Sequence, residues 1–178
     1  MNEEVTVATA AEMHALGRRL AALLRAGDLV ILSGPLGAGK TTLTQGIGAG
    51  LGVRGPVTSP TFVIARVHPS LDRARGLAAS GPALVHADAY RLGSVLEMDD
   101  LDLDTDTATS VTVVEWGEGL AEGLAADRLE IAITPDNTAL EGDDTALERD
   151  APRTVMIAGV GRRWHGIELP PADLADRL

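Results

Sequence analysis

The stretch from Gly34 to Thr41 limits the folds open to this chain more than any other. It reads Gly-Pro-Leu-Gly-Ala-Gly-Lys-Thr and matches the phosphate-loop pattern at every fixed position. That pattern belongs between a buried strand and the start of a helix. Residues 28–32 predict such a strand, and residues 41–51 predict the helix. The chain is therefore expected to adopt an α/β fold, with a nucleotide phosphate as its first candidate ligand.

The residue types in this loop suit the binding of phosphate. Its glycines permit positive φ angles and close approach of the backbone, so successive N–H groups can turn inward around an anion. Lys40 is the only lysine in the chain, and it supplies a compact ammonium where the broad guanidinium of an arginine would fit poorly. Thr41 offers a hydroxyl to Mg²⁺. The alternative is a glycine-rich turn without a ligand, which the complete motif in this context disfavours.

Strand and helix patterns alternate along the chain, which predicts a mostly parallel central sheet flanked by helices and covered on both faces. Thr9 and Glu12 form a capping-box pattern for a helix that should run to about Arg25. Three glycines weaken the helix after the phosphate loop, so we expect either close packing on one side or fraying there. The other expected strands are 5–8, 61–67, 83–86, 111–115, 129–133 and 154–157, followed by a polar tail.

Length and composition indicate one domain. We expect residues 1–178 to form a single domain with the P-loop NTPase fold, in which 135–152 is poorly ordered or variable. The chain has no cysteine, no secretory signal pattern and no long uncharged apolar run, which predicts a cytoplasmic protein without a membrane span. A net charge of −11 and few aromatic residues argue against direct binding of nucleic acid.

Two carboxylates follow apolar strand patterns and are candidates for the chemistry next to the phosphates. Asp88 and Glu115 each end such a run, and the carboxyl ends of parallel strands meet at the ligand crevice. Either acid could reach Mg²⁺, and the alternative for each is an ordinary acid that caps the next helix or turn. Thr61 follows Ser59 and Pro60 in a segment that could sense the γ-phosphate, although a simple turn into a strand is also consistent with its composition.

Several of these segments together resemble the TsaE family, the ATPases of bacterial tRNA threonylcarbamoyladenosine synthesis. The resemblance covers roughly residues 7–133. It rests on the segments Leu16-Gly17, Gly34 to Thr42, Ser59-Pro60-Thr61-Phe62, His86-Ala87-Asp88-Ala89-Tyr90-Arg91-Leu92 and Glu115-Trp116. The phosphate loop is common to many families, whereas the histidine-to-arginine run followed by Glu-Trp is specific.

The resemblance implies a role for each matching residue, with ATP or ADP and Mg²⁺ as ligands. Asp88 would position or activate water, and Thr61 would sense the γ-phosphate. Thr41 and Glu115 would hold Mg²⁺. The nucleotide would contact Leu36, Gly37, Ala38, Gly39, Lys40, Thr41, Thr42 and Trp116. For His86, a histidine satisfied in the core is an equal alternative to a site residue, and for Trp116 simple packing is nearly as well supported as nucleotide contact.

The resemblance also implies partners. ATP turnover would reset a complex of TsaD and TsaB, which modifies adenosine 37 of tRNAs that read codons beginning with A. The chain would meet tRNA only indirectly, through that complex. One departure is Pro35, since many family members carry an acid there, and any contact made by that acid is in doubt.

Two other functions fit a phosphate loop. A small-molecule kinase would pass the γ-phosphoryl group to an acceptor, but the loop that could act as its lid is rich in Ala and Gly and offers no clear acceptor contacts. A nucleotide-dependent regulatory module would change partners without useful turnover. The acidic run from Glu97 to Asp106 lacks the glycine and glutamate of a calcium loop and predicts a solvated face or a partner contact instead.

Overall fold

The computed structural model describes residues 1–60, 65–71, 81–90, 109–136 and 152–172. In chain order, with η for 3-10 helices, the elements are β1 (Asn2–Val7), α1 (Ala10–Ala21), β2 (Leu29–Ser33), α2 (Lys40–Leu51), β3 (Ala65–His68), β4 (Ala83–Asp88), β5 (Ser110–Glu115), η1 (Glu122–Leu124), β6 (Arg128–Pro135), β7 (Arg153–Val160) and η3 (Arg162–Trp164). The predicted α/β class is confirmed, with the phosphate loop between β2 and α2.

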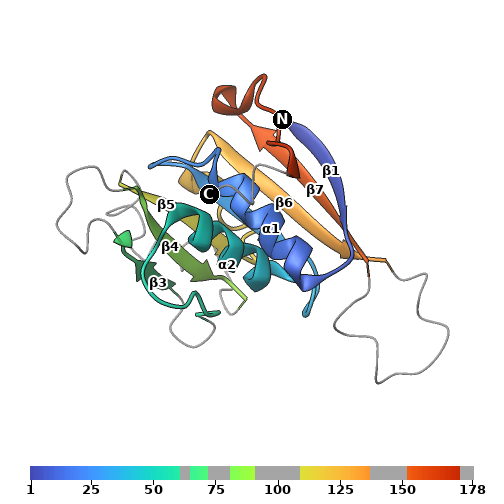
Figure 1. Ribbon diagram of the computed structural model, residues 1–178. Helices are drawn as coiled ribbons and strands as arrows, with labels where there is room; N and C mark the ends of the chain where they lie inside the picture. Colours follow the sequence, from blue (N-terminus) through green and yellow to red (C-terminus); the bar gives the residue numbers. More distant parts are fainter. Residues whose placement is uncertain (61–64, 72–80, 91–108, 137–151, 173–178) are drawn as a thin grey trace.

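A seven-stranded sheet in the order β1-β7-β6-β2-β5-β4-β3 forms the frame of the molecule (Figure 1). The four central strands, β6, β2, β5 and β4, pair in parallel. At both edges the pairing is antiparallel, between β6, β7 and β1 on one side and between β4 and β3 on the other. Because the central strands are parallel, the carboxyl ends of β2, β4 and β5 lie at the same end of the sheet. Ligands of such sheets bind at that end.

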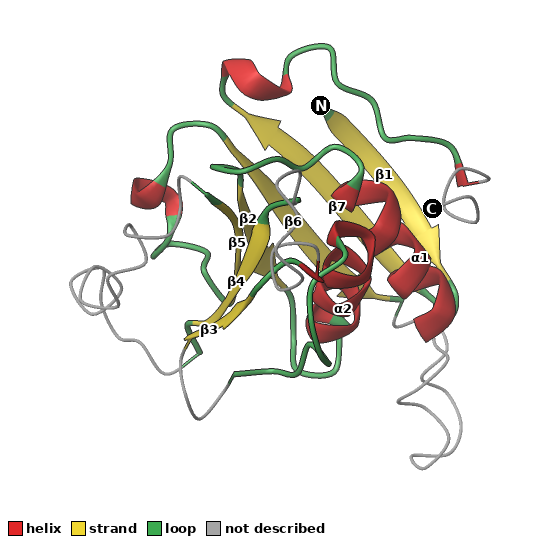
Figure 2. Cartoon of the chain, turned by 60° about the vertical axis from the view of Figure 1, so that its left-hand side comes forward, coloured by secondary structure: helices red, strands yellow, loops and turns green. Residues whose placement is uncertain are grey.

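Helices α1 and α2 lie side by side on one face of the sheet (Figure 2). Glycines make this contact possible: a Cβ atom on Gly46 would stand 2.1 Å from the carbonyl oxygen of His14, and one on Gly17 would stand 2.4 Å from that of Leu43. The expected close packing of the α2 glycines is confirmed. Because α2 begins at the phosphate loop, this contact also fixes where the loop sits. None of the described helices has the length and apolar content that a membrane crossing requires.

The two faces of the sheet are covered differently. The main apolar core lies under α1 and α2, where Leu16, Leu43 and Ile47 meet the strands. On the opposite face a smaller cluster, which includes Ile31 and Val114, is covered by the segment of residues 116–125 around η1. Cover on both faces was expected, but within the described ranges both α-helices share one face. A 3-10 turn and its flanking loop cover part of the other.

Helix α1 begins where the capping-box pattern predicts. The hydroxyl of Thr9 accepts a hydrogen bond from the Glu12 N–H at 3.1 Å, and the Glu12 carboxylate accepts one from the Ala8 N–H at 2.6 Å. The predicted end at about Arg25 is wrong, because the helix ends at Ala21. The chain after it closes tighter turns with bonds between residues three apart, so its leucines continue the apolar stripe without continuing the helix.

The segment after β7 contains a core residue that the sequence analysis missed. Trp164, in η3, is fully buried in the main core. Its carbonyl oxygen accepts a hydrogen bond from the N-terminal ammonium of Met1 at 2.9 Å. The segment predicted to be a polar tail therefore begins with a residue of the apolar core.

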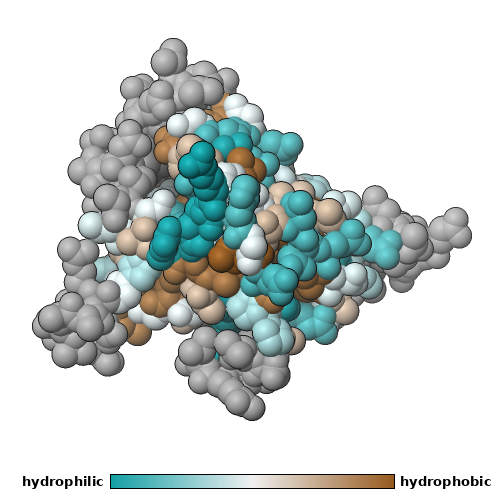
Figure 3. Space-filling model, turned by 90° about the horizontal axis from the view of Figure 1, so that it is seen from above, coloured by the Kyte–Doolittle hydropathy of each residue, from teal (hydrophilic) through white to brown (hydrophobic). Residues whose placement is uncertain are grey.

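Figure 3 shows the molecule from above, with hydrophilic and apolar residues interspersed on that surface.

Candidate nucleotide-binding site

The phosphate loop has the backbone geometry that its glycines predict. Gly34, Gly37 and Gly39 have φ angles of 137°, 79° and 106°. A side chain at Gly34 would also collide with the carbonyl oxygen of Ile133, 2.4 Å from the Cβ position. Gly39 caps α2 without a side-chain hydrogen bond. Free N–H groups at a helix start, together with the positive end of the helix dipole, favour an anion at this point.

Lys40 bridges the two sides of the loop. Its ammonium donates hydrogen bonds to the carbonyl oxygens of Gly34 at 2.7 Å and Pro35 at 2.9 Å. Burial lowers the pKa of the Lys40 ammonium, and the negative charges of Glu115 and Asp88 oppose that shift. An ammonium carries three donors, so one remains for a phosphate oxygen. The charge is thus held in place by the loop that would receive the phosphates.

Glu115, at the end of β5, joins two neighbouring elements through its carboxylate. The hydroxyl of Thr41, in the first turn of α2, donates to Oε1 at 2.9 Å and Oε2 at 3.1 Å. The Nε2 atom of His86, on β4, lies 2.8 Å from Oε1. The carboxylate is buried and His86 is fully buried. A hydroxyl and a carboxylate in contact beside a phosphate loop are the hard oxygen donors that Mg²⁺ prefers.

Asp88 lies on the strand next to Glu115, and the two residues are paired in register across β4 and β5. Its carboxylate accepts hydrogen bonds from the Ser59 hydroxyl at 3.2 Å and from the Tyr90 N–H at 3.0 Å. Asp88 is 6% exposed. Its orientation therefore depends on the segment before β3, in which the sequence analysis placed the sensor.

Trp116 turns the chain sharply out of β5. It is the single non-glycine residue with a positive φ, 60°, in the part of the chain that the structure describes. Its N–H donates to the carbonyl oxygen of Leu32 at 2.8 Å, which ties the turn to β2. The ring centroid lies 3.6 Å from the Lys40 ammonium and 5.2 Å from the Tyr90 ring centroid. A left-handed backbone at a bulky residue costs about 1–3 kcal/mol and persists where surrounding contacts hold it.

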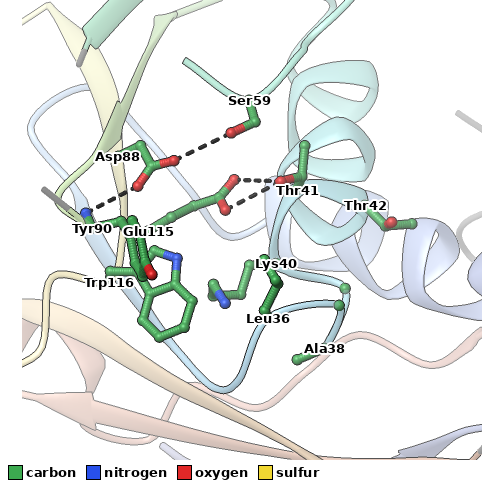
Figure 4. Close-up of a pocket in the computed structure, with 12 residues that line it drawn as sticks. Leu36, Ala38, Lys40, Thr41, Thr42, Ser59, Asp88, Tyr90, Glu115 and Trp116 are labelled. Carbon is green, nitrogen blue, oxygen red and sulfur yellow. Dashed lines mark hydrogen bonds between the residues drawn. The ribbon is translucent and has the colours of Figure 1, made fainter. Parts of the chain in front are cut away.

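These side chains surround one pocket of about 410 Å³ (Figure 4). It is lined by Leu36, Gly37, Ala38, Gly39, Lys40, Thr41, Thr42, Ser59, Asp88, Tyr90, Glu115 and Trp116. The residues to which the sequence assigned a role are all in this set except Thr61, which lies outside the described residues. His86, which the sequence left open between core and site, is not in the set. Ser59 belongs to the segment expected to hold the sensor, and Tyr90 to the motif that contains Asp88, but neither was assigned a role of its own. The signal for Ser59 was its hydroxyl beside Pro60, and for Tyr90 it was the two-residue spacing from Asp88.

The parallel centre of the sheet, the phosphate loop and the acids at the strand ends define the class: this is a single-domain α/β protein with the P-loop NTPase fold. The family model for Threonylcarbamoyl adenosine biosynthesis protein TsaE matches residues 7–143, most of the chain. The chain therefore belongs to the TsaE family, and the resemblance drawn from the sequence motifs is confirmed.

Individual relatives agree with the family model. A tRNA threonylcarbamoyladenosine biosynthesis protein TsaE from Streptomyces coelicolor is 61% identical over 153 residues, which cover 85% of this chain and 93% of that protein. The protein of the same name from Bacillus subtilis is 35% identical over 154 residues, 86% of this chain and 83% of its own length. Among solved structures, Bacillus subtilis YdiB superposes with a TM-score of 0.65 at 28% identity, covering 99% of this chain and 95% of that one.

Proposed function

We propose that this chain binds ATP and ADP with Mg²⁺ and hydrolyses ATP as an accessory subunit in the formation of threonylcarbamoyladenosine at position 37 of tRNAs that read ANN codons. The observation that carries the proposal is the single pocket in which the Lys40 ammonium, the Thr41–Glu115 pair and Asp88 meet. The names of its relatives give the pathway, and the pocket supplies groups suited to nucleotide turnover.

The phosphate loop and its lysine hold the triphosphate in this proposal. Backbone N–H groups of Gly37 to Thr42 surround the phosphate oxygens, and Lys40 places a positive charge on them. Trp116 and Leu36 line the same pocket and contact the nucleotide beyond its phosphates. Thr41 and Glu115 hold Mg²⁺, which when bound neutralises charge on the β- and γ-phosphate oxygens.

Asp88 acts on the water in the proposed reaction. The water oxygen forms a bond to the γ-phosphorus while the bond from that phosphorus to the β–γ bridging oxygen breaks, so ADP and phosphate leave. Asp88 accepts the hydrogen bond of the attacking water and then its proton, since its carboxylate lines the pocket while that of Glu115 already accepts from Thr41. Ser59 fixes its orientation, and Thr61 senses the γ-phosphate.

The proposed partners are TsaD and TsaB. This chain binds their complex, and hydrolysis of ATP then resets the complex for the next reaction. The net charge of −11 fits a subunit that meets tRNA through its partners rather than directly. Phosphate release from ATP tests the whole proposal, measured for the chain alone and with the TsaD–TsaB pair, with Lys40→Ala as the blank. Slow release that rises with the pair is expected. Release that the pair does not change would contradict the partnership and direct the search to kinase acceptors.

A further inference from the structure

His86 makes a contact that the proposed reaction does not use. It lies on β4, between β5 and the edge strand β3, and it is fully buried, with its Nε2 atom 2.8 Å from Oε1 of Glu115. The sequence left two interpretations of this residue open, a core histidine or a site residue. Because His86 contacts Glu115, a candidate ligand of the metal, the interpretation as a site residue is favoured.

The hydrogen-bond partners of Glu115 decide which imidazole nitrogen carries the proton. An ionised carboxylate can only accept, so the Nε2 atom of His86 must donate. The other ring nitrogen, Nδ1, is buried and has no hydrogen-bond partner among the described residues. A neutral ring with its hydrogen on Nε2 leaves only a lone pair unpaired at Nδ1.

Two donors from two different elements therefore converge on one carboxylate. The Thr41 hydroxyl reaches Glu115 from α2, and the His86 ring reaches it from β4. A glutamate side chain has three rotatable bonds, and burial without donors would favour other rotamers. The histidine holds Oε1 from the side of the sheet. This leaves the carboxylate aimed at Thr41 and the phosphate loop.

We propose that His86 is a positioning residue, which orients the Glu115 carboxylate for the divalent cation that accompanies the nucleotide. The inference rests on the proposed function of this pocket and adds a residue to it. Partners of metal-binding side chains typically change metal affinity about 10–100-fold when they are removed. The effect is expected on the metal-dependent part of nucleotide binding and not on nucleotide binding itself.

The chain offers a matched control in His68. It is also a buried histidine, on the adjacent strand β3 and the same side of the sheet, because it pairs in register with Leu84, two residues from His86. The Nε2 atom of His68 finds no hydrogen-bond partner in the part of the chain that the structure describes. Replacing this residue removes a buried imidazole next to the site without removing a donor to Glu115.

The test measures Mn²⁺ binding to the protein–ADP complex by the loss of the free Mn²⁺ electron paramagnetic resonance signal. ADP affinity in EDTA is measured beside it. His86→Leu is expected to weaken Mn²⁺ binding about tenfold or more, with metal-free ADP affinity within about twofold of the parent. His86→Gln should recover most of the loss, since its amide nitrogen stands as many bonds from Cβ as Nε2 does. His68→Leu should leave Mn²⁺ binding unchanged.

Three results would overturn the proposal. Unchanged Mn²⁺ affinity in His86→Leu would show that the contact is incidental. Equal losses in His86→Leu and His68→Leu, or losses of ADP affinity in EDTA that match the losses with Mn²⁺, would show general damage to the core.

If His86→Leu does not fold, His86→Gln and His86→Asn make the same comparison. The asparagine amide is one bond too short to reach Glu115, so the His86→Asn protein should bind Mn²⁺ more weakly than the His86→Gln protein. A parent protein that binds no ADP with Mn²⁺ would instead refute the proposed function.

Discussion

Two groups of buried and half-buried charges among the described residues are used in opposite ways. In the nucleotide pocket, Lys40 and Glu115 face a cavity and keep hydrogen-bonding capacity for a ligand. In what we call the terminal clasp, formed by Met1, Asp28, Arg163 and Trp164, charged groups contact other parts of the chain. Arg163 donates to the Leu23 carbonyl at 2.6 Å and pairs with Asp28 at 3.1 Å. Burial of charge therefore indicates function only where an open pocket accompanies it.

The comparison predicts that stability and activity can be changed separately, and the largest expected effect is on the clasp. Trp164→Ala removes a fully buried indole from the main core and should lower the free energy of unfolding by about 3–5 kcal/mol. Urea unfolding measures this loss. Trp116→Ala is the matched control, because its half-buried ring should cost less stability. Equal losses in the two variants would contradict the division between clasp and pocket.

The next effect belongs to the pocket alone. Lys40→Ala should lower phosphate release from ATP about 10²–10³-fold, because it removes the charge that faces the phosphates. The free energy of unfolding should change little or rise, since a buried ammonium is removed. Lys40→Arg should recover little activity despite its charge, because a planar guanidinium replaces a compact ammonium. Full activity in that variant would refute the role assigned to the ammonium.

A third variant tests whether the pocket depends on the packing of α1 against α2. Gly46→Ala places a methyl group 2.1 Å from the backbone oxygen of His14, which cannot turn aside. A loss of about 1–3 kcal/mol in the free energy of unfolding is expected, together with weaker ADP binding, because α2 carries Lys40 and Thr41. Gly123→Ala is the control, since no atom lies near its Cβ position. Weaker stability with unchanged ADP affinity would show that the loop does not depend on the α1–α2 contact.

The smallest effect concerns pH. Burial lowers the pKa of His68 from 6.5, and the nearby charge of Arg66 lowers it further. A lowered pKa in the folded state means that the unfolded chain binds more protons below pH 6.5. The stability that His68 contributes should be present above that pH and decline as the pH falls from about 6.5 toward the folded-state pKa. His68→Gln should flatten this part of the stability curve in urea titrations at several pH values. An unchanged slope would contradict the prediction.

The sequence predicted the pocket better than the framework around it. The phosphate loop, the capping box and the strands that end at Asp88 and Glu115 depend on local patterns, so they were recognised. Trp164 was missed because a lone aromatic in a polar tail has no periodicity, and its burial depends on contacts with the other end of the chain. The same limit applies to the contact of His86 with Glu115, which joins residues 29 positions apart.

The antiparallel edges of the sheet and the early end of α1 also depend on tertiary contacts. β7 extends to Val160 because it pairs with β1 and β6 along its length, and no local signal marks that end. Helix α1 ends at Ala21, although Leu23 and Leu24 beyond it still pack against the core. An apolar stripe therefore does not show where a helix ends. Ser59 was placed in the right segment, but its hydrogen bond to Asp88 requires the fold to be known.

The paired register of Asp88 and Glu115 limits how this molecule can change in evolution. Side chains alternate between the faces of a strand, so a slip of β4 by one residue would turn Asp88 away and set an alanine, Ala87 or Ala89, level with Glu115. Insertions between Ser70 and Gly81 leave that register intact. A single insertion or deletion within Ala83–Asp88 would replace a carboxylate with a methyl group. Lineages should therefore vary freely in the length of the connection before β4 and hardly at all in the length of the strand.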